Sequence, residues 1–233
     1  MRGGVKRAFM IIAAIVITIA IAAAVVWVLT KKNEIDLTNN ICYSDRHVYS
    51  GKNGDLAVTV YAGVAEKSFL TDGKASEVVN FCKIGLNVIN TAYSKVAAFD
   101  YNIIADGKLY AGKLTRDSLT SEMSGSVDLP DASKIKSIVI RYGSKDHEIP
   151  LSGVLDGRMS ADDAYKAAVK IFSKEISNGI KNGVFNREIY IKFVTGYGGE
   201  EPYYWYVAFI ASDSDYWAVL MDSRTGEVDV KRG

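Results

Sequence analysis

The amino-acid sequence predicts a mixed fold: an N-terminal transmembrane helix, an all-β sandwich, and an α+β domain with one helix on an antiparallel meander. Three observations indicate this order. Residues 8–30 form an apolar run without a charge, short runs rich in β-branched residues follow in 55–151, and a helical pattern with three strand-like runs occupies 158–233. The formal net charge is only +1, so the chain lacks the basic excess typical of nucleic-acid binding.

The apolar run 8–30 is long enough for a membrane anchor. As a helix, 23 residues would extend about 34 Å, against about 30 Å for a hydrocarbon core. A cleaved secretory signal peptide is the alternative, although its apolar region usually has only about 7–15 residues. Three basic residues precede the run and two follow it, which favours a cytoplasmic N-terminus.

This pattern predicts a single-pass protein of the cell membrane with most of its mass extracytoplasmic. The expected parts are a cytoplasmic tail (1–7), a signal anchor in the lipid bilayer (8–30), a polar stalk (31–54), a β-sandwich domain (55–151) and an α+β domain (158–233).

Within 55–151 the composition favours short strands over 56–64, 78–90, 95–114 and 134–142. Strands at intervals of roughly 8–12 residues are typical of a sandwich. In the last run Ile138, Ile140 and Tyr142 share the more apolar face, which we expect to point inward. The serine-rich segment 115–133 is expected to be a loop or short helix.

Part of this region resembles the small immunoglobulin-like sandwiches of bacterial extracytoplasmic proteins. The likeness rests on a strand ending in an Asn-containing turn (87–91), a following strand (99–105) and the hairpin dipeptide Asp106-Gly107. The resemblance implies a module that binds, spaces or stiffens.

Residues 160–179 have a helical signature. Ser160 and Asp163 have the spacing of a capping box, and Asn178-Gly179 suits a helix end. One apolar stripe recurs at intervals of three and four residues: Ala164, Ala168, Ile171, Phe172 and Ile176. Strand-like runs follow over 187–196, 203–212 and 216–223, and the last turns on Gly226.

This helix-then-meander order resembles the PepSY domain. The residues that carry the likeness are "SADDAYKAA" at the helix start, Trp205-Tyr206-Val207 on the middle strand, and the closing segment 219–228 with Asp222, Thr225 and Gly226. The glycine-rich loop "TGYGGEEP" departs from the family pattern. PepSY modules are associated with restraint of peptidases, so the resemblance implies an envelope peptidase as a protein partner.

The aromatic run 203–206 has two possible roles. Trp205, Val207 and Phe209 share one strand face, which we expect to cover the helix stripe. The opposite face is either an ordinary strand surface or a binding face, because tyrosine suits both. The candidate binding residues are Tyr190, Tyr204, Tyr206 and Tyr216, with Tyr197, Glu200 and Glu201 in the glycine-rich loop.

The sequence offers little catalytic chemistry. His47 and His147, the two histidines, are expected to be solvated loop residues, and neither has zinc-site spacing. We therefore expect no metal and no cofactor. Cys42 and Cys82 either form a disulfide or are free, with Cys82 a small buried apolar residue.

The functional expectation is a membrane-anchored, extracytoplasmic, non-catalytic binding or regulatory protein with a protein partner, in the bacterial cell envelope that the two resemblances imply. The alternatives are an envelope enzyme or enzyme subunit that uses carboxylates near the closing turn, such as Asp222 and Glu227, or a purely structural spacer. Neither the partner nor the oligomeric state follows from the sequence.

Overall fold

A computed structural model describes residues 36–67, 75–117, 123–196 and 200–233. The chain divides into two compact units, Met1–Thr38 and Asn39–Gly233. Nearly all described residues belong to the second unit, which contains the described strands and α-helices.

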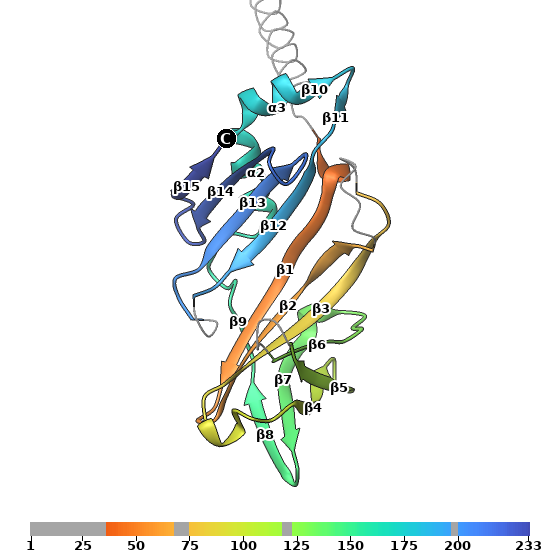
Figure 1. Cartoon of the computed structure of the whole chain (residues 1–233), viewed down its shortest axis with the longest axis vertical. Helices are drawn as coiled ribbons and strands as arrows, with labels where there is room; N and C mark the ends of the chain where they lie inside the picture. Colours follow the sequence, from red (N-terminus) through yellow and green to blue (C-terminus); the bar gives the residue numbers. More distant parts are fainter. Residues whose placement is uncertain (1–35, 68–74, 118–122, 197–199) are drawn as a thin grey trace, which may run out of the picture. The chain divides into compact units, whose positions relative to one another are not determined.

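Most of the second unit is one large sheet (Figure 1). Its strand order is β15-β14-β13-β12-β1-β2-β3-β6-β5-β4-β7-β8, and β9 pairs with β1 outside this path. Only β1 with β12 is a parallel pair among the ladders described. The strands are β1 (Ile41–Lys52), β2 (Leu56–Glu66), β3 (Val78–Val88), β4 (Ala98–Ala105), β5 (Lys108–Arg116), β6 (Met123–Ser126), β7 (Ile135–Tyr142), β8 (Lys145–Pro150), β9 (Ser152–Gly153), β12 (Glu188–Val194), β13 (Tyr204–Ile210), β14 (Tyr216–Asp222) and β15 (Val228–Arg232).

The remaining elements are short. They are α2 (Ala161–Ile171), α3 (Ser173–Gly179), a small hairpin of β10 (Ile180–Lys181) and β11 (Val184–Phe185), and the 3-10 turns η1 (Thr38–Asn40), η2 (Thr91–Tyr93) and η3 (Ala132–Lys134).

Strands β1 to β9 form what we call the curled half of the sheet. The sheet curls until β9 pairs with β1, so that Tyr49 faces Gly153. The chains approach closely at this closure, since a Cβ on Gly51 would lie 2.1 Å from the carbonyl oxygen of Pro150. The curl encloses a core contributed mainly by alternate residues of its strands, including Leu56, Val58, Val60, Ile84, Phe99, Tyr101, Ile103, Leu114, Ile138, Ile140 and Ile149.

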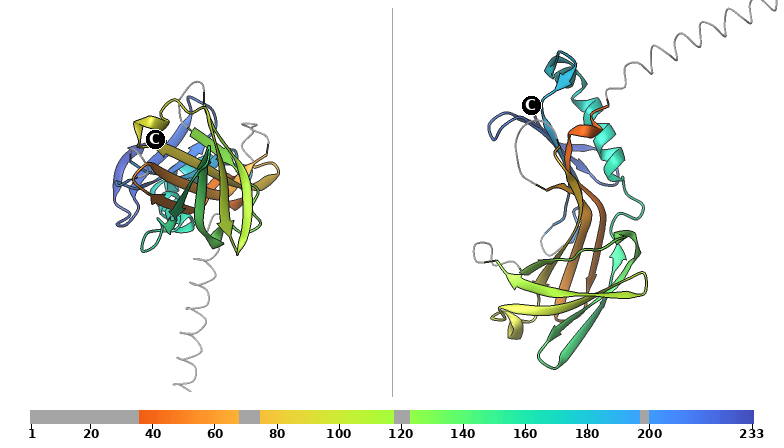
Figure 2. Two further views of the ribbon diagram at one scale, coloured as in Figure 1. Left: turned by 90° about the horizontal axis from the view of Figure 1, so that it is seen from below. Right: turned by 90° about the vertical axis from the view of Figure 1, so that its right-hand side faces the viewer.

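Strands β12 to β15 with α2 and α3 form the helix-covered half. Both helices lie on one face of these strands (Figure 2). Phe172, at the junction of α2 and α3, is fully buried, and its ring lies 5.6 Å from that of Phe209 on β13. Trp205 is also fully buried, and its indole N–H donates to the carbonyl of Met159 at 2.9 Å. The prediction that the Trp205 face is core is therefore confirmed.

Local sequence signals explain several element ends. Ser160 and Asp163 form the expected capping box at the start of α2. Asp106 and Gly107 both have positive φ, 50° and 71°, as a two-residue hairpin turn requires between β4 and β5. The closing motif is also a turn: the Asp222 carboxylate accepts from the backbone N–H groups of Arg224 and Thr225, and Gly226 has φ of 72°.

The expected fold class is wrong. Instead of an immunoglobulin-like sandwich followed by a separate PepSY-like α+β domain, the described strands are mostly joined in one sheet through the β1–β12 pair. Segment 31–54 is not simply a stalk, since Ile41–Lys52 form the strand shared by both halves. The expected loop 115–133 contains β6, and the expected single helix is divided at Phe172.

The expected membrane anchor must be corrected as well. In the parts of the chain that the structure describes, no helix has both the length and the apolar character needed to cross a bilayer. Residues 8–30, on which that expectation rested, lie outside the described residues. The single-pass anchor, the cell-membrane localisation and the extracytoplasmic placement are therefore not supported.

Candidate ligand pocket on the open face

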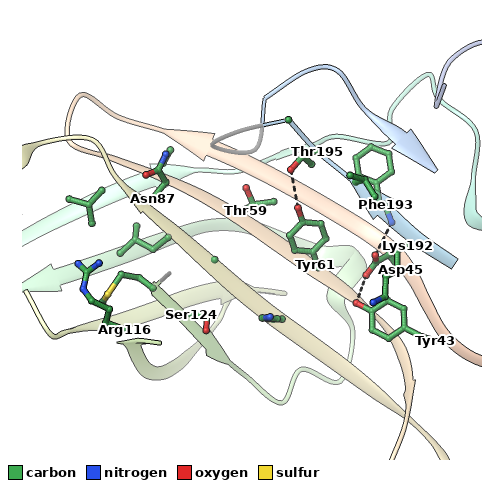
Figure 3. A pocket seen from close by; sticks show the side chains of 18 of the residues that line it. Tyr43, Asp45, Thr59, Tyr61, Asn87, Arg116, Ser124, Lys192, Phe193 and Thr195 are labelled. Atoms are coloured by element: carbon green, nitrogen blue, oxygen red, sulfur yellow. Dashed lines mark hydrogen bonds between the residues drawn. The ribbon is translucent and has the colours of Figure 1, made fainter. Parts of the chain in front are cut away.

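The sheet carries a pocket of about 830 Å³, lined largely by residues that point away from the core. The pocket is lined from β1, β2, β3, β5, β6 and β12 (Figure 3). On β2 its lining residues, such as Thr59 and Tyr61, alternate with core residues, as successive side chains of a strand must, whereas on β3 the core residue Leu86 also lines it. Its volume is within the range of about 300–1,000 Å³ typical of small-molecule sites.

Asp45 is the buried acid at one end of this pocket. Its Oδ1 accepts from the Tyr43 hydroxyl at 2.9 Å, and its Oδ2 accepts from the Phe193 backbone N–H at 2.9 Å (Figure 3). Burial raises the pKa of Asp45 to about 6, although the two hydrogen bonds and the nearby Lys192 and Lys83 act in the opposite direction. Since both oxygens are engaged, Asp45 anchors the wall of the pocket and is not positioned as a free base.

The charge of the pocket is mainly positive. Lys83, Arg116 and Lys192 line it against the single acid Asp45. Arg116 donates to the carbonyls of Ser94 and Val96. Among the described residues, neither Lys83 nor Lys192 forms an ion pair.

Aromatic rings lie beside these cations. The Lys192 ammonium is 5.2 Å from the centre of the Tyr43 ring, which stacks on Phe81 at 5.0 Å. The Tyr61 hydroxyl is within hydrogen-bond distance of the Thr195 hydroxyl, at 3.3 Å, and so joins β2 to the end of β12. The pocket therefore combines ammonium groups with flat apolar surface.

The predicted tyrosine face adjoins this pocket but does not line it. Tyr206 is paired with Lys192 across β12 and β13, and both Tyr204 and Tyr206 are half-buried. Tyr216 is half-buried under the Arg232 guanidinium, 4.0 Å from its ring centre. Tyr190 is buried, and its hydroxyl donates to Glu188 at 2.9 Å.

The predicted loop residues have structural partners. Glu200 pairs with Lys52 at 2.8 Å, and Glu201 pairs with Arg158 and Arg224. Tyr197 lies outside the described residues. Asp222, a residue of the alternative carboxylate site, organises the closing turn, and its backbone hydrogen bonds lower its pKa.

The cysteines are both free and buried. Cys82 is opposite Ala62, and Tyr43, next to Cys42, is opposite Ala65, so β2 separates the two cysteines. Two strand spacings amount to about 9.6 Å, whereas a disulfide requires Cα atoms within about 7 Å. The possible disulfide is therefore not formed.

The histidines are not the solvated loop residues that we expected. His47 lies within β1. The His147 side chain is only 11 % exposed; its ring packs edge-on against Tyr93 and lies 3.6 Å from the Asp55 carboxylate. His147 is therefore part of the packing around Tyr93, and His47 is half-buried within its strand.

Sequence reasoning missed the pocket and one buried cluster. Cys42, Glu66 and Glu188 are all buried, and their potential ligand atoms lie within 4.8 Å of one another. No local spacing could reveal this set, because each residue comes from a different strand. The alternating pattern of 56–64 indicates that Thr59 and Tyr61 face away from the core. It does not indicate which strands lie beside them.

Comparisons with known proteins do not assign the chain to a family. No family model matches it, and no curated protein or solved structure shows significant similarity. Nothing in these comparisons identifies a PepSY-like domain or bears on function.

Proposed function

We propose that this chain is a non-catalytic binding protein whose pocket takes an amphipathic anion. The observation that carries the proposal is the pair of ammonium groups, Lys83 and Lys192, on a pocket wall that also presents aromatic and aliphatic side chains. A carboxylate or phosphate group would contact the lysines, and an apolar portion would lie along Tyr61, Leu86 and Val88.

The positions of the charges support an anionic ligand. Of the four charged residues that line the pocket three are basic, and the one acid is hydrogen-bonded into the wall. Lys83 and Lys192 are both exposed, so a contact from either lysine to an anion is screened by water and contributes about 0.2–1 kcal/mol. Each lysine contact is therefore worth at most about fivefold in affinity.

A non-catalytic role is supported by how the polar groups are used. The pocket carboxylate with a raised pKa has both oxygens occupied, by Tyr43 and Phe193. A general base needs an oxygen within reach of the substrate proton, at about 2.6–3.2 Å. Asp45 holds the pocket wall in place, whereas proton abstraction would require it to give up two hydrogen bonds.

The test is a calorimetric titration of the full chain with alkyl carboxylates and alkyl phosphates, using the matching alkyl alcohols as uncharged probes. We expect binding of the anions and a severalfold preference over the alcohols. Replacing Lys83 and Lys192 with Met should weaken anion binding severalfold, by up to about 25-fold, from two contacts of up to about fivefold each.

The matched control replaces two exposed lysines at hairpin turns, Lys108 and Lys145, with Met. It changes the net charge equally and should leave affinity unchanged. If both double variants bind anions alike, the attraction is nonspecific and the pocket is not the site; if no anion binds the wild-type chain, the proposal is wrong.

A further inference from the structure

We propose that Cys42, Glu66 and Glu188 form a binding site for one zinc ion, separate from the ligand pocket. The thiol and both carboxylates are buried, with exposed fractions of 1 %, 7 % and 1 %. Their potential ligand atoms lie within 4.8 Å of one another.

The fold brings the three residues to one end of the sheet. Cys42 is near the start of β1, Glu66 ends β2 and Glu188 begins β12. β1 lies between the other two, parallel to β12 and antiparallel to β2, so the beginning of β1 meets the end of β2 and the beginning of β12. The β1–β12 register shifts between Ile41 and Tyr43, at the position of Cys42.

An unsatisfied oxygen points to a missing ligand. Glu66 Oε2 is buried and has no hydrogen-bond partner; it is the one such side-chain atom among the described residues. A buried carboxylate oxygen without a partner is costly, because desolvation of a charged group is not repaid. A cation between Glu66 and Glu188 would provide that partner and offset the repulsion between two buried carboxylates.

Each carboxylate is already oriented by a donor. The backbone N–H of Ser76 donates to Glu66 Oε1 at 2.5 Å, and the Tyr190 hydroxyl donates to Glu188 Oε2 at 2.9 Å. Such outer contacts commonly orient carboxylate ligands in metal sites. The cluster thus has the organisation of a site, with two oriented carboxylates beside one thiol.

The ligand set selects the metal. Thiolate sulfur favours zinc over magnesium or calcium, which prefer oxygen alone, and zinc accepts carboxylate oxygens as well. Zinc bonds of about 2.0–2.3 Å place tetrahedral ligand atoms roughly 3.3–3.6 Å apart. Side-chain movement of about 1 Å would bring the cluster to that separation.

A bound ion would join β2, β1 and β12 at the strand that both halves share. We expect zinc to raise the thermal stability of the full chain, because an ion that binds only the folded state stabilises it by mass action. This role is independent of the anion pocket and of its proposed ligand.

The test is metal uptake by the full chain, purified without a histidine tag and stripped with a chelator. Titration with zinc against a chromophoric competitor should show one ion per chain, and cobalt should give a sulfur-to-cobalt charge-transfer band. Cys42→Ser and Glu66→Gln should each weaken zinc binding at least about tenfold and abolish or shift that band.

Cys82→Ser is the matched control, since Cys82 is also free and buried but lies outside the cluster. It should keep one zinc ion and the cobalt band. The proposal is overturned if the wild-type chain binds no stoichiometric zinc, shows no sulfur-to-cobalt band, or loses its metal equally with Cys82→Ser. Should Cys42→Ser not fold, the band in the wild-type chain and the weaker zinc binding of Glu66→Gln decide.

Discussion

The curled half and the helix-covered half bury the same side of one sheet with different partners. In the curled half the strands supply both walls, so Phe99 and Ile138 pack against residues of the same sheet. In the helix-covered half, helix residues such as Phe172 cover Phe209 and Trp217. The difference teaches that a helix layer can be recognised from a local repeat, whereas a sheet that closes on itself depends on long-range pairing.

The largest expected effect tests whether the two halves unfold together. Phe172→Ala and Phe99→Ala each remove a buried ring and should cost about 3–5 kcal/mol of unfolding free energy. Because β1 belongs to both ladders, we expect one cooperative transition in urea for either variant. Tryptophan fluorescence reports on the helix-covered half through Trp205 and Trp217, and circular dichroism reports on the whole sheet.

The control for this measurement is a Trp27→Phe background, which removes the tryptophan outside the described residues. If the halves unfold independently, Phe172→Ala should shift the fluorescence transition of the helix-covered half to lower urea. A later transition in circular dichroism, from the curled half, should then stay at the same urea concentration. That result would show that the two halves unfold separately although they share β1.

A smaller effect concerns pH at the junction of the halves. Asp45 has a pKa of about 6 when folded, above its ordinary value of 3.8, so the folded chain holds this proton more tightly than the unfolded chain. Its contribution to stability is therefore greatest below pH 4 and falls as pH rises to about 6, by about 2–3 kcal/mol.

Asp45→Asn should remove that loss. From about pH 4 to pH 7 the unfolding free energy of the variant should rise by about 2–3 kcal/mol relative to that of the wild type, as measured by urea denaturation. Asp229→Asn, which replaces an exposed carboxylate, is the control for the loss of one negative charge. A constant difference across this range would contradict the burial of Asp45.

The smallest expected effect tests the helix layer alone. Ser160→Ala removes the cap of α2, in which the Asp163 backbone N–H donates to the Ser160 hydroxyl at 3.1 Å, and should cost about 1 kcal/mol. Ser177→Ala, in α3 and exposed, should change stability by less than about 0.5 kcal/mol. Equal losses in thermal denaturation would show that the cap does not matter.

Local patterns predicted the elements of the helix-covered half well. The capping box of Ser160, the stripe through Phe172 and the turn at Gly226 depend on residues a few positions apart, and each is present. The hairpin at Asp106-Gly107 was equally readable. Such features follow from backbone sterics and short-range hydrogen bonds, which the neighbouring residues determine.

Local patterns could not predict the order of the strands in the sheet or the residues that form the pocket. β3 pairs with β6, and β1 pairs with β12, so consecutive strands are not always neighbours. The polar residues of 41–52 suggested a stalk because both faces of β1 carry polar side chains, yet Ser44 and Asp45 are buried by distant strands. The pocket and the cluster at Cys42 depend on the same pairings and were missed for that reason.

The parallel pairing of β1 with β12 also bears on synthesis. Ile41 pairs with Ile189, which is synthesised nearly 150 residues later. Until then one edge of β1 has unpaired backbone groups, a condition that invites association with other chains. Nascent or truncated forms that end before β12 should therefore need chaperone protection, whereas the completed chain closes that edge itself.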